Sequence, residues 1–206
     1  MTGQSDERLD RLWLPVAQAV VDAAAHEVKD VLNGVSLNLE VIRSRSSDAE
    51  LANKVVAPFA TAAAAQLEIL TARAEALLFL ARPARNPADV AITLRHFAAL
   101  LVPATKAEGG GAALAVEGVE HAVPTAAPGH ATRLAIGAAL LVLTRRGGSC
   151  RCRLERQEGS SETVVRFSHE PAVALTLDPE VTSAISECSI KVRGADSDLL
   201  LVFPGS

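Results

Sequence analysis

Residues 23–45 read AAAHEVKDVLNGVSLNLEVIRSR, and the rest of the chain is best interpreted from them. Their apolar side chains recur at steps of three and four, which predicts an amphipathic helix. The predicted apolar stripe comprises Val28, Leu32, Val35, Leu39 and Ile42. His26 precedes Val28 by two residues, so at about 100° per residue it lies roughly 200° from the stripe. We therefore expect His26 to face solvent.

Polar residues follow His26 on the same side of this helix. Lys29, Asp30 and Asn33 come three, four and seven residues later, which puts them near the imidazole. The simplest interpretation is an ordinary solvated helix face with an exposed histidine. The alternative is a histidine that is kept available for chemistry.

The sequence around His26 resembles the H-box of sensor histidine kinases, whose commonest form is His-Glu-Leu-Arg/Lys-Asn/Thr-Pro-Leu-Asn followed by an apolar helix. The matching residues are His26, Glu27, the Leu32-Asn33 pair and the run Asn38-Leu39-Glu40. Asp30 and Val31 stand where the family has Asn or Thr and then Pro. The phosphatase role that the family gives to the first of these positions therefore does not carry over. The resemblance implies that His26 is the phosphoacceptor and Glu27 its catalytic carboxylate.

The composition indicates a globular protein. The chain has 206 residues, 49% of them hydrophobic, and a formal net charge of −4, which suits one or two small domains. No basic run gives an electrostatic reason to expect nucleic acid or an anionic membrane as a partner. No segment has the ~18 uninterrupted apolar residues of a membrane span, and the N-terminus MTGQSDERLDRL is too charged for a signal peptide. We expect a cytoplasmic protein without membrane insertion.

The cysteines and the remaining histidines predict no metal centre. Cys150-x-Cys152 lacks a second ligand pair, and alternate residues of a strand share a face in any case. With Cys188 as a third cysteine, no even disulfide framework forms. We assign the other histidines to structural or surface positions: His96, His121, His130 and His169. Trp13 is expected to pack near the end of a helical bundle.

Residues 1–83 are expected to form an antiparallel helical hairpin. One helix runs from Asp6 to about Arg45, with Pro15 as a kink or as its true start. Ser46-Ser47-Asp48 ends it and supplies N-cap candidates for a second helix that reaches Ala81. Two helices of about 35 residues cannot bury both apolar sides alone, so a dimeric four-helix bundle is the natural completion. The alternative is a monomeric hairpin packed on the rest of the chain.

Residues 84–206 are expected to form a second domain, joined through a linker at Pro83, Asn86 and Pro87. The predicted helices cover 88–101, 130–145 and 179–188, and the predicted strands cover 112–116, 150–157, 163–168 and 199–203. This order is similar to the ATP-binding domain of histidine kinases, an antiparallel sheet covered on one face by helices. We therefore predict an α+β fold: a hairpin in a dimeric four-helix bundle, followed by a degenerate ATPase-like α/β sandwich.

The residues with which that family binds nucleotide are missing here. The helix over 130–145 has no asparagine for Mg²⁺ and phosphate, and Leu140 and Thr144 fall about where two would be expected. The Asp-x-Gly-x-Gly box is replaced by His169-Glu170-Pro171, without glycine. Gly109–Gly111 lacks the Lys-Ser/Thr of a P-loop and is interpreted as a turn. We expect that this chain binds no cofactor.

A histidine bundle joined to a kinase-like domain without ATP resembles the dimeric histidine phosphotransferases of multistep phosphorelays. The resemblance implies that His26 takes a phosphoryl group from the aspartate of one response-regulator receiver and passes it to another. Glu27 or a water-linked carboxylate would hold the proton on the second ring nitrogen and stabilise the developing imidazolium charge. Lys29 would offset phosphoryl charge, Asp30 would oppose it, and Asn33 would donate a hydrogen bond. Mg²⁺ would come with the receiver, and the expected partners are a second copy of this chain and receiver domains.

Two other functions are compatible with the same residues. The first is a pseudokinase scaffold that binds a response regulator or a kinase without carrying phosphate. The second is an autokinase with an unusual nucleotide site, for which the order of elements is the only support.

Overall fold

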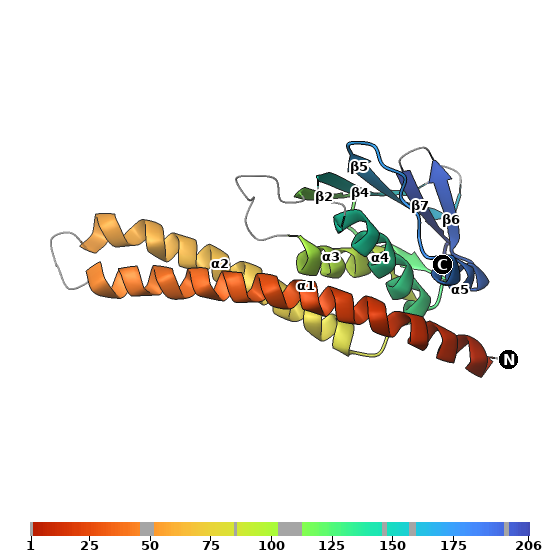
Figure 1. Cartoon of the computed structure of the whole chain (residues 1–206), viewed down its shortest axis with the longest axis horizontal. Coiled ribbons are helices and arrows are strands. Elements are labelled where there is room, and N and C mark those ends of the chain that lie inside the picture. Colours follow the sequence, from red (N-terminus) through yellow and green to blue (C-terminus); the bar gives the residue numbers. More distant parts are fainter. Residues whose placement is uncertain are drawn as a thin grey trace.

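Two long helices form a stalk at the N-terminal end of the chain. The computed structural model describes residues 2–45, 52–84, 86–102, 113–145, 148–156, 160–195 and 198–206. Helix α1 (Thr2–Arg45) and helix α2 (Ala52–Ala81) lie side by side as a hairpin (Figure 1). Both continue through an internal proline, Pro15 in α1 and Pro58 in α2. The predicted helix pair is confirmed, whereas the predicted turn Ser46-Ser47-Asp48 lies outside the described residues.

The predicted stripe on α1 is buried only in part. The buried apolar residues of α1 beyond the first turns are Val20, Ala24, Val31 and Val35, of which Val35 belongs to the stripe, and Val28 and Ile42 of the stripe are half-buried. Of the predicted stripe, Leu32 and Leu39 are 45% and 53% exposed. Leu32 follows Val31 by one position, about 100° around the helix, so the two cannot face the same neighbour. The predicted stripe extends to the exposed edge of a wide apolar arc on α1, whereas the side buried in the structure is the other edge of that arc.

A five-stranded mixed sheet forms the opposite side of the molecule. Its strand order is β2-β4-β5-β7-β6. The strands are β2 (Ala113–Glu117), β4 (Ser149–Arg156), β5 (Thr163–Glu170), β6 (Lys191–Ala195) and β7 (Asp198–Phe203). Strands β2 and β4 are parallel and the other pairs are antiparallel, so the expectation of an antiparallel sheet is wrong at this edge. The connection between β2 and β4 contains a helix, which is the connection that parallel neighbours need.

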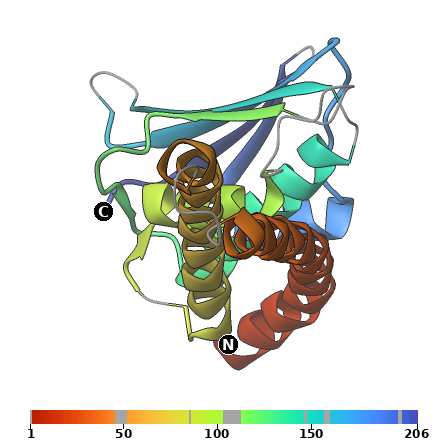
Figure 2. The same ribbon diagram turned by 90° about the vertical axis from the view of Figure 1, so that its left-hand side faces the viewer.

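Three helices lie between the sheet and the stalk (Figures 1 and 2). They are α3 (Val90–Leu101), α4 (Gly129–Thr144) and α5 (Pro179–Glu187). Two short strands, β1 (Ala88–Asp89) and β3 (Pro124–Thr125), pair before α3 and α4. The Asp89 carboxylate accepts hydrogen bonds from the backbone N–H groups of Ile92 and Val123, so it caps α3 and joins it to the segment before β3.

The stalk and the sheet share one hydrophobic core. Leu9, Val20 and Ala24 of α1 belong to the same buried cluster as the apolar residues of α3, α4 and the inner sheet face. Trp13 packs edge-on against Phe97 of α3 with ring centroids 6.0 Å apart, which confirms that it is a packing residue. The hairpin is therefore docked on the rest of its own chain along the N-terminal half of α1.

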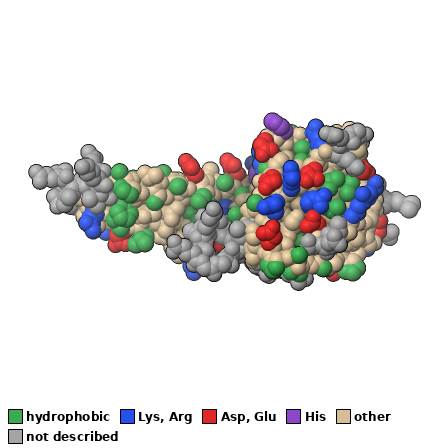
Figure 3. All heavy atoms as spheres, turned by 90° about the horizontal axis from the view of Figure 1, so that it is seen from above, with side chains coloured by type: hydrophobic (Ala, Val, Ile, Leu, Met, Phe, Trp, Pro, Cys, Tyr) green, Lys and Arg blue, Asp and Glu red, His purple; other side chains and the backbone are tan. Residues whose placement is uncertain are grey.

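The outer face of the sheet is charged and mixed in sign (Figure 3). Glu117 lies 3.7 Å from Arg151 and 3.8 Å from Arg153, and Arg166 pairs with Asp198 at 2.8 Å. On the inner face of β4, Cys150 and Cys152 alternate with these arginines and are buried. The period-2 pattern of a half-buried strand therefore explains the Cys-x-Cys spacing.

Candidate functional site

His26 lies near the middle of α1, in the stalk. Its side chain is 77% exposed, which confirms the prediction that it faces solvent. Residues one helical turn away on either side, Asp22 and Asp30, are exposed as well. The imidazole is therefore presented on an acidic, solvated side of α1, where a macromolecular partner can reach it.

Asp30 is the predicted neighbour that the structure places beside the imidazole. Its Oδ2 atom lies 3.6 Å from Nε2 of His26. The separation is longer than a hydrogen bond but within ion-pair range, and both groups are exposed. A carboxylate at this distance is placed to stabilise the positive charge that develops on the ring when the other nitrogen acts as a nucleophile.

Glu27 occupies a different environment, because its carboxylate lies 3.2 Å from the buried guanidinium of Arg73 on α2. The Glu27 side chain is 25% exposed and that of Arg73 is 2% exposed. Arg73 also donates to the carbonyls of Ala99 and Val102, at 3.3 and 2.8 Å, at the C-terminal end of α3. In this structure Glu27 thus joins the helix that carries His26 to α2 and to the end of α3.

Sequence reasoning missed Arg73, although its position gave a signal. It lies three residues after Leu70 and four before Leu77, so it falls on the apolar side of α2. A charged residue on an apolar helix face requires a buried partner, and a carboxylate on the neighbouring helix is the obvious choice.

Lys29 and Asn33 lie between His26 and the apolar arc of α1. Both are exposed, and both border a shallow groove of about 410 Å³ between α1 and α2. The remaining residues of this groove are apolar: Val21, Ala25, Val28, Leu32 and Leu77. The five predicted site residues are thus divided among three environments, with Asp30 at the imidazole, Glu27 at Arg73, and Lys29 and Asn33 at the groove.

The positions where nucleotide ligands were sought carry internal packing. Leu140 is fully buried in the hydrophobic core, and the Thr144 hydroxyl donates to the Leu140 carbonyl at 2.9 Å. His169 is 5% exposed, with Nδ1 2.7 Å from the carbonyl oxygen of Pro171. These groups are engaged with the protein itself.

Metal ligands and membrane spans were sought throughout the described ranges. No three of the His, Cys, Asp and Glu side chains described there come together as a metal site would require. Likewise, none of the helices in the described part of the chain combines the length and the apolar character needed to cross a bilayer.

Comparison with known proteins gives little further information. No protein-family model matches the sequence, and no match is found among curated proteins. One similar solved structure is a bacterial phosphotransferase, with 14% sequence identity and a TM-score of 0.39. The alignment covers 92% of this chain and 96% of that chain. A likeness of this size establishes neither a shared fold nor a shared activity.

Proposed function

We propose that this chain is a dimeric histidine phosphotransferase that passes a phosphoryl group between receiver aspartates through His26 without binding ATP. The observation that carries the proposal is the 77% exposed imidazole on a helical hairpin, with the Asp30 carboxylate 3.6 Å from one ring nitrogen. Leu140 falls about where the kinase resemblance places a nucleotide ligand, and its burial in the hydrophobic core supports the part of the proposal that concerns ATP.

In the proposed reaction, neutral His26 attacks the phosphorus of an aspartyl phosphate on a docked receiver. The bond from phosphorus to the aspartate oxygen breaks, and the electron pair leaves with the aspartate as a carboxylate. The attacking ring becomes positively charged, and Asp30 stabilises that charge at the second ring nitrogen. The charge is lost when the second nitrogen releases its proton. Lys29 is the nearby exposed cation available to the transferred phosphoryl group, and Mg²⁺ arrives with the receiver.

The exposed apolar residues of α1 support the dimeric part of the proposal. Leu14, Val21, Leu32 and Leu39 are 43–59% exposed and, at about 100° per residue, lie within roughly 20° of one another around the helix. Leu67 and Leu78 add 49% and 55% exposed side chains on α2. Exposed apolar residues that extend this far along two helices are better accommodated in the core of a four-helix bundle than in contact with water. His26 lies roughly 120–140° from the stripe, so such a dimer leaves the imidazole accessible.

A phosphotransfer assay tests the function directly. Receiver domains are phosphorylated with ³²P-labelled acetyl phosphate and mixed with the wild type, His26→Ala and His121→Ala, the last being a control at another exposed histidine. We expect acid-labile label on the wild type and on His121→Ala, and none on His26→Ala. Equal labelling of His26→Ala refutes the assignment of His26.

Introduction of a charged residue into the exposed apolar stripe of α1 tests whether the chain forms the proposed dimer. Light scattering after size exclusion is expected to give a dimer for the wild type and a monomer for Leu32→Asp. Leu37→Asp is the matched control, since Leu37 is 64% exposed but lies on the opposite side of α1. A wild type that remains monomeric at 100 µM contradicts the proposed bundle.

One observation favours a second function, a scaffold that binds a receiver or a kinase without phosphotransfer. Glu27, the carboxylate that the kinase resemblance assigns to the histidine, is paired with Arg73 in this structure. The scaffold hypothesis predicts that His26→Ala binds a receiver with wild-type affinity while neither protein becomes phosphorylated. Phosphorylation of the wild type by any receiver excludes it.

A further inference from the structure

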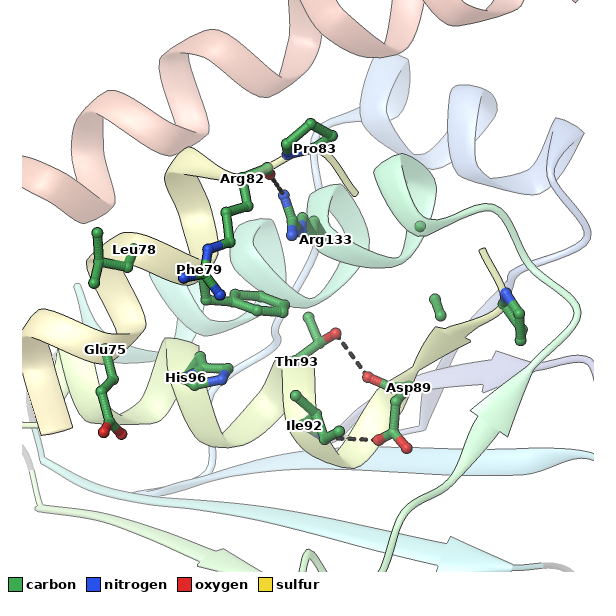
Figure 4. A pocket seen from close by; sticks show the side chains of 13 residues that line it. Glu75, Leu78, Phe79, Arg82, Pro83, Asp89, Ile92, Thr93, His96 and Arg133 are labelled. Atoms are coloured by element: carbon green, nitrogen blue, oxygen red, sulfur yellow. Dashed lines mark hydrogen bonds between the residues drawn. The ribbon is translucent and has the colours of Figure 1, made fainter. Parts of the chain in front are cut away.

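A cavity of about 600 Å³ lies where α2 ends and the chain enters the sheet half of the molecule (Figure 4). Its walls come from the last turns of α2, the linker at Pro83 and Pro87, α3, and the first turn of α4. Cavities of roughly 300–1,000 Å³ with a few convergent polar groups hold small molecules in many proteins. The cavity is separate from the His26 site and from the apolar stripe of α1, and it shares Leu78 of α2 with the proposed dimer surface.

The wall of this cavity contains a buried cation, Arg133, that forms no ion pair within the described part of the chain. Arg133 of α4 is 6% exposed. Its Nη1 atom donates to the carbonyl of Arg82 at 2.7 Å, and its guanidinium carbon lies 4.3 Å from the centre of the Phe79 ring. Among the described residues, no carboxylate forms an ion pair with Arg133. A buried guanidinium without a counter-ion is costly, and burial accordingly lowers the pKa of Arg133 from its ordinary value.

The two carboxylates near this cavity do not supply the missing charge. Both oxygens of Asp89 accept backbone N–H groups, from Ile92 and from Val123. Glu75 lies at the rim, and in Figure 4 its carboxylate points away from Arg133. A second cation, Arg82, lines the same cavity and is exposed. Arg133 and Arg82 therefore provide positive charge at the cavity. The Asp89 carboxylate is hydrogen-bonded to backbone N–H groups, and that of Glu75 points away from Arg133.

The remaining walls suit the uncharged part of an organic molecule. Phe79 stacks on the His96 ring with centroids 4.4 Å apart, and Leu78 and Ile92 line the same space. Burial, helped by the positive charge of Arg95, lowers the pKa of His96, so at neutral pH the imidazole is an uncharged hydrogen-bonding group. An apolar wall beside two guanidinium groups matches a ligand with an anionic head and a hydrophobic or aromatic body.

We propose that this cavity binds a small organic anion, whose carboxylate or phosphate group contacts Arg133 and Arg82. The body of the ligand packs against Ile92 and the edge of Phe79. Because the cavity is formed by α2 on one side and by α3 and α4 on the other, the bound anion bridges the stalk and the sheet half of the molecule. This proposal is independent of phosphotransfer at His26.

Binding is tested with the unphosphorylated full chain and no receiver, so that its outcome is separate from that of the phosphotransfer assay. The probes are benzoate and phenyl phosphate, with benzamide as a neutral molecule of similar shape to benzoate. Titrations are followed by amide NMR. We expect both anions to bind with millimolar or tighter affinity and to shift the amide signals of Thr93, His96 and Gly129, which line the cavity. The stronger of the two anions identifies the preferred head group.

Two arginine variants distinguish the site from general anion binding. Arg133→Met is expected to weaken binding of either anion at least tenfold, whereas Arg145→Met, at an exposed arginine just after α4, leaves it unchanged. If Arg133→Met does not fold, Arg82→Met at the exposed rim is expected to weaken binding severalfold. The proposal is overturned if neither anion binds at 20 mM, if benzamide binds as tightly as benzoate, or if the shifted amides lie away from the cavity.

Discussion

Replacement of Arg73 by methionine is expected to cost this chain more stability than the loss of any exposed ion pair. The Arg73 side chain is almost completely buried and donates to three acceptors, on α1 and at the end of α3. Arg73→Met leaves the carbonyls of Ala99 and Val102 without this donor, and it leaves Glu27 without its cation. Loss of one partner of a buried ion pair typically costs about 3–5 kcal/mol.

Two features of the structure place the expected loss of stability for Arg73→Met at the lower end of this range. Glu27 is 25% exposed and can be rehydrated, and Nη1 of Arg73 has no hydrogen-bond partner to lose. We therefore expect Arg73→Met to lower the free energy of unfolding by about 3 kcal/mol. The matched control is Arg8→Met, because Arg8 approaches Glu187 more closely, at 2.6 Å, but with side chains that are 34% and 50% exposed. Exposed pairs contribute about 0–1 kcal/mol, so burial and not distance should decide the ranking.

Urea denaturation at one protein concentration measures both variants. The fluorescence of Trp13, the single tryptophan, reports the contact between α1 and α3, and circular dichroism reports helix content. Equal slopes with urea concentration in the three proteins would show that the same surface is exposed on unfolding. A loss below about 1 kcal/mol for Arg73→Met, no larger than that for Arg8→Met, would refute the claim that this arginine joins the stalk to α3.

Three further predictions concern the core and the caps. Gly137→Ala should destabilise by about 1–3 kcal/mol in urea titrations despite the better helix propensity of alanine, because a Cβ atom there would lie 2.7 Å from Cε1 of Phe97. Asp89→Ala should cost about 1–2 kcal/mol in the same titrations, since it removes the cap of α3; no change would mean that water replaces the carboxylate. Burial raises the pKa of the Cys152 thiol, so at pH 8 this cysteine should react with an aromatic disulfide reagent only after urea is added, as mass spectrometry of the labelled peptide would show.

The long elements of the fold could be predicted from the sequence because their apolar periodicity is strong. The two stalk helices, α4 and the strands β4 and β5 lie within a few residues of the predicted ranges. Strand β6 was missed, because Lys191–Ala195 reads KVRGA, with little alternation and only one large apolar residue. It is an edge strand, and its pairing with β7 is set by its neighbour more than by its own sequence.

The contacts of a candidate site could be predicted from the sequence only where all of its residues lie on one helix. His26 and Asp30 are four residues apart on α1, so spacing alone brings them together. Arg73, the partner of Glu27, lies 46 residues further along the chain. The backbone carbonyls at the end of α3 that accept hydrogen bonds from Arg73 lie further along still. The cavity at Arg133 requires α2, α3 and α4 to be assembled, and helix spacing contains no information about that assembly.

The width of the apolar arc on α1 connects the fold to the proposed function. An amphipathic helix of a globular protein typically turns an apolar stripe of about 100° or more towards the core. On α1 the apolar positions extend from Val20 and Val31, which are buried in the hairpin and core, to Leu32 and Leu39, which remain exposed, and span about 120° at 100° per residue. The buried edge is used by this chain and the exposed edge is available to a second copy. The opposite side of α1, which carries His26 and Asp30 together with the exposed Leu37, is then left for a partner.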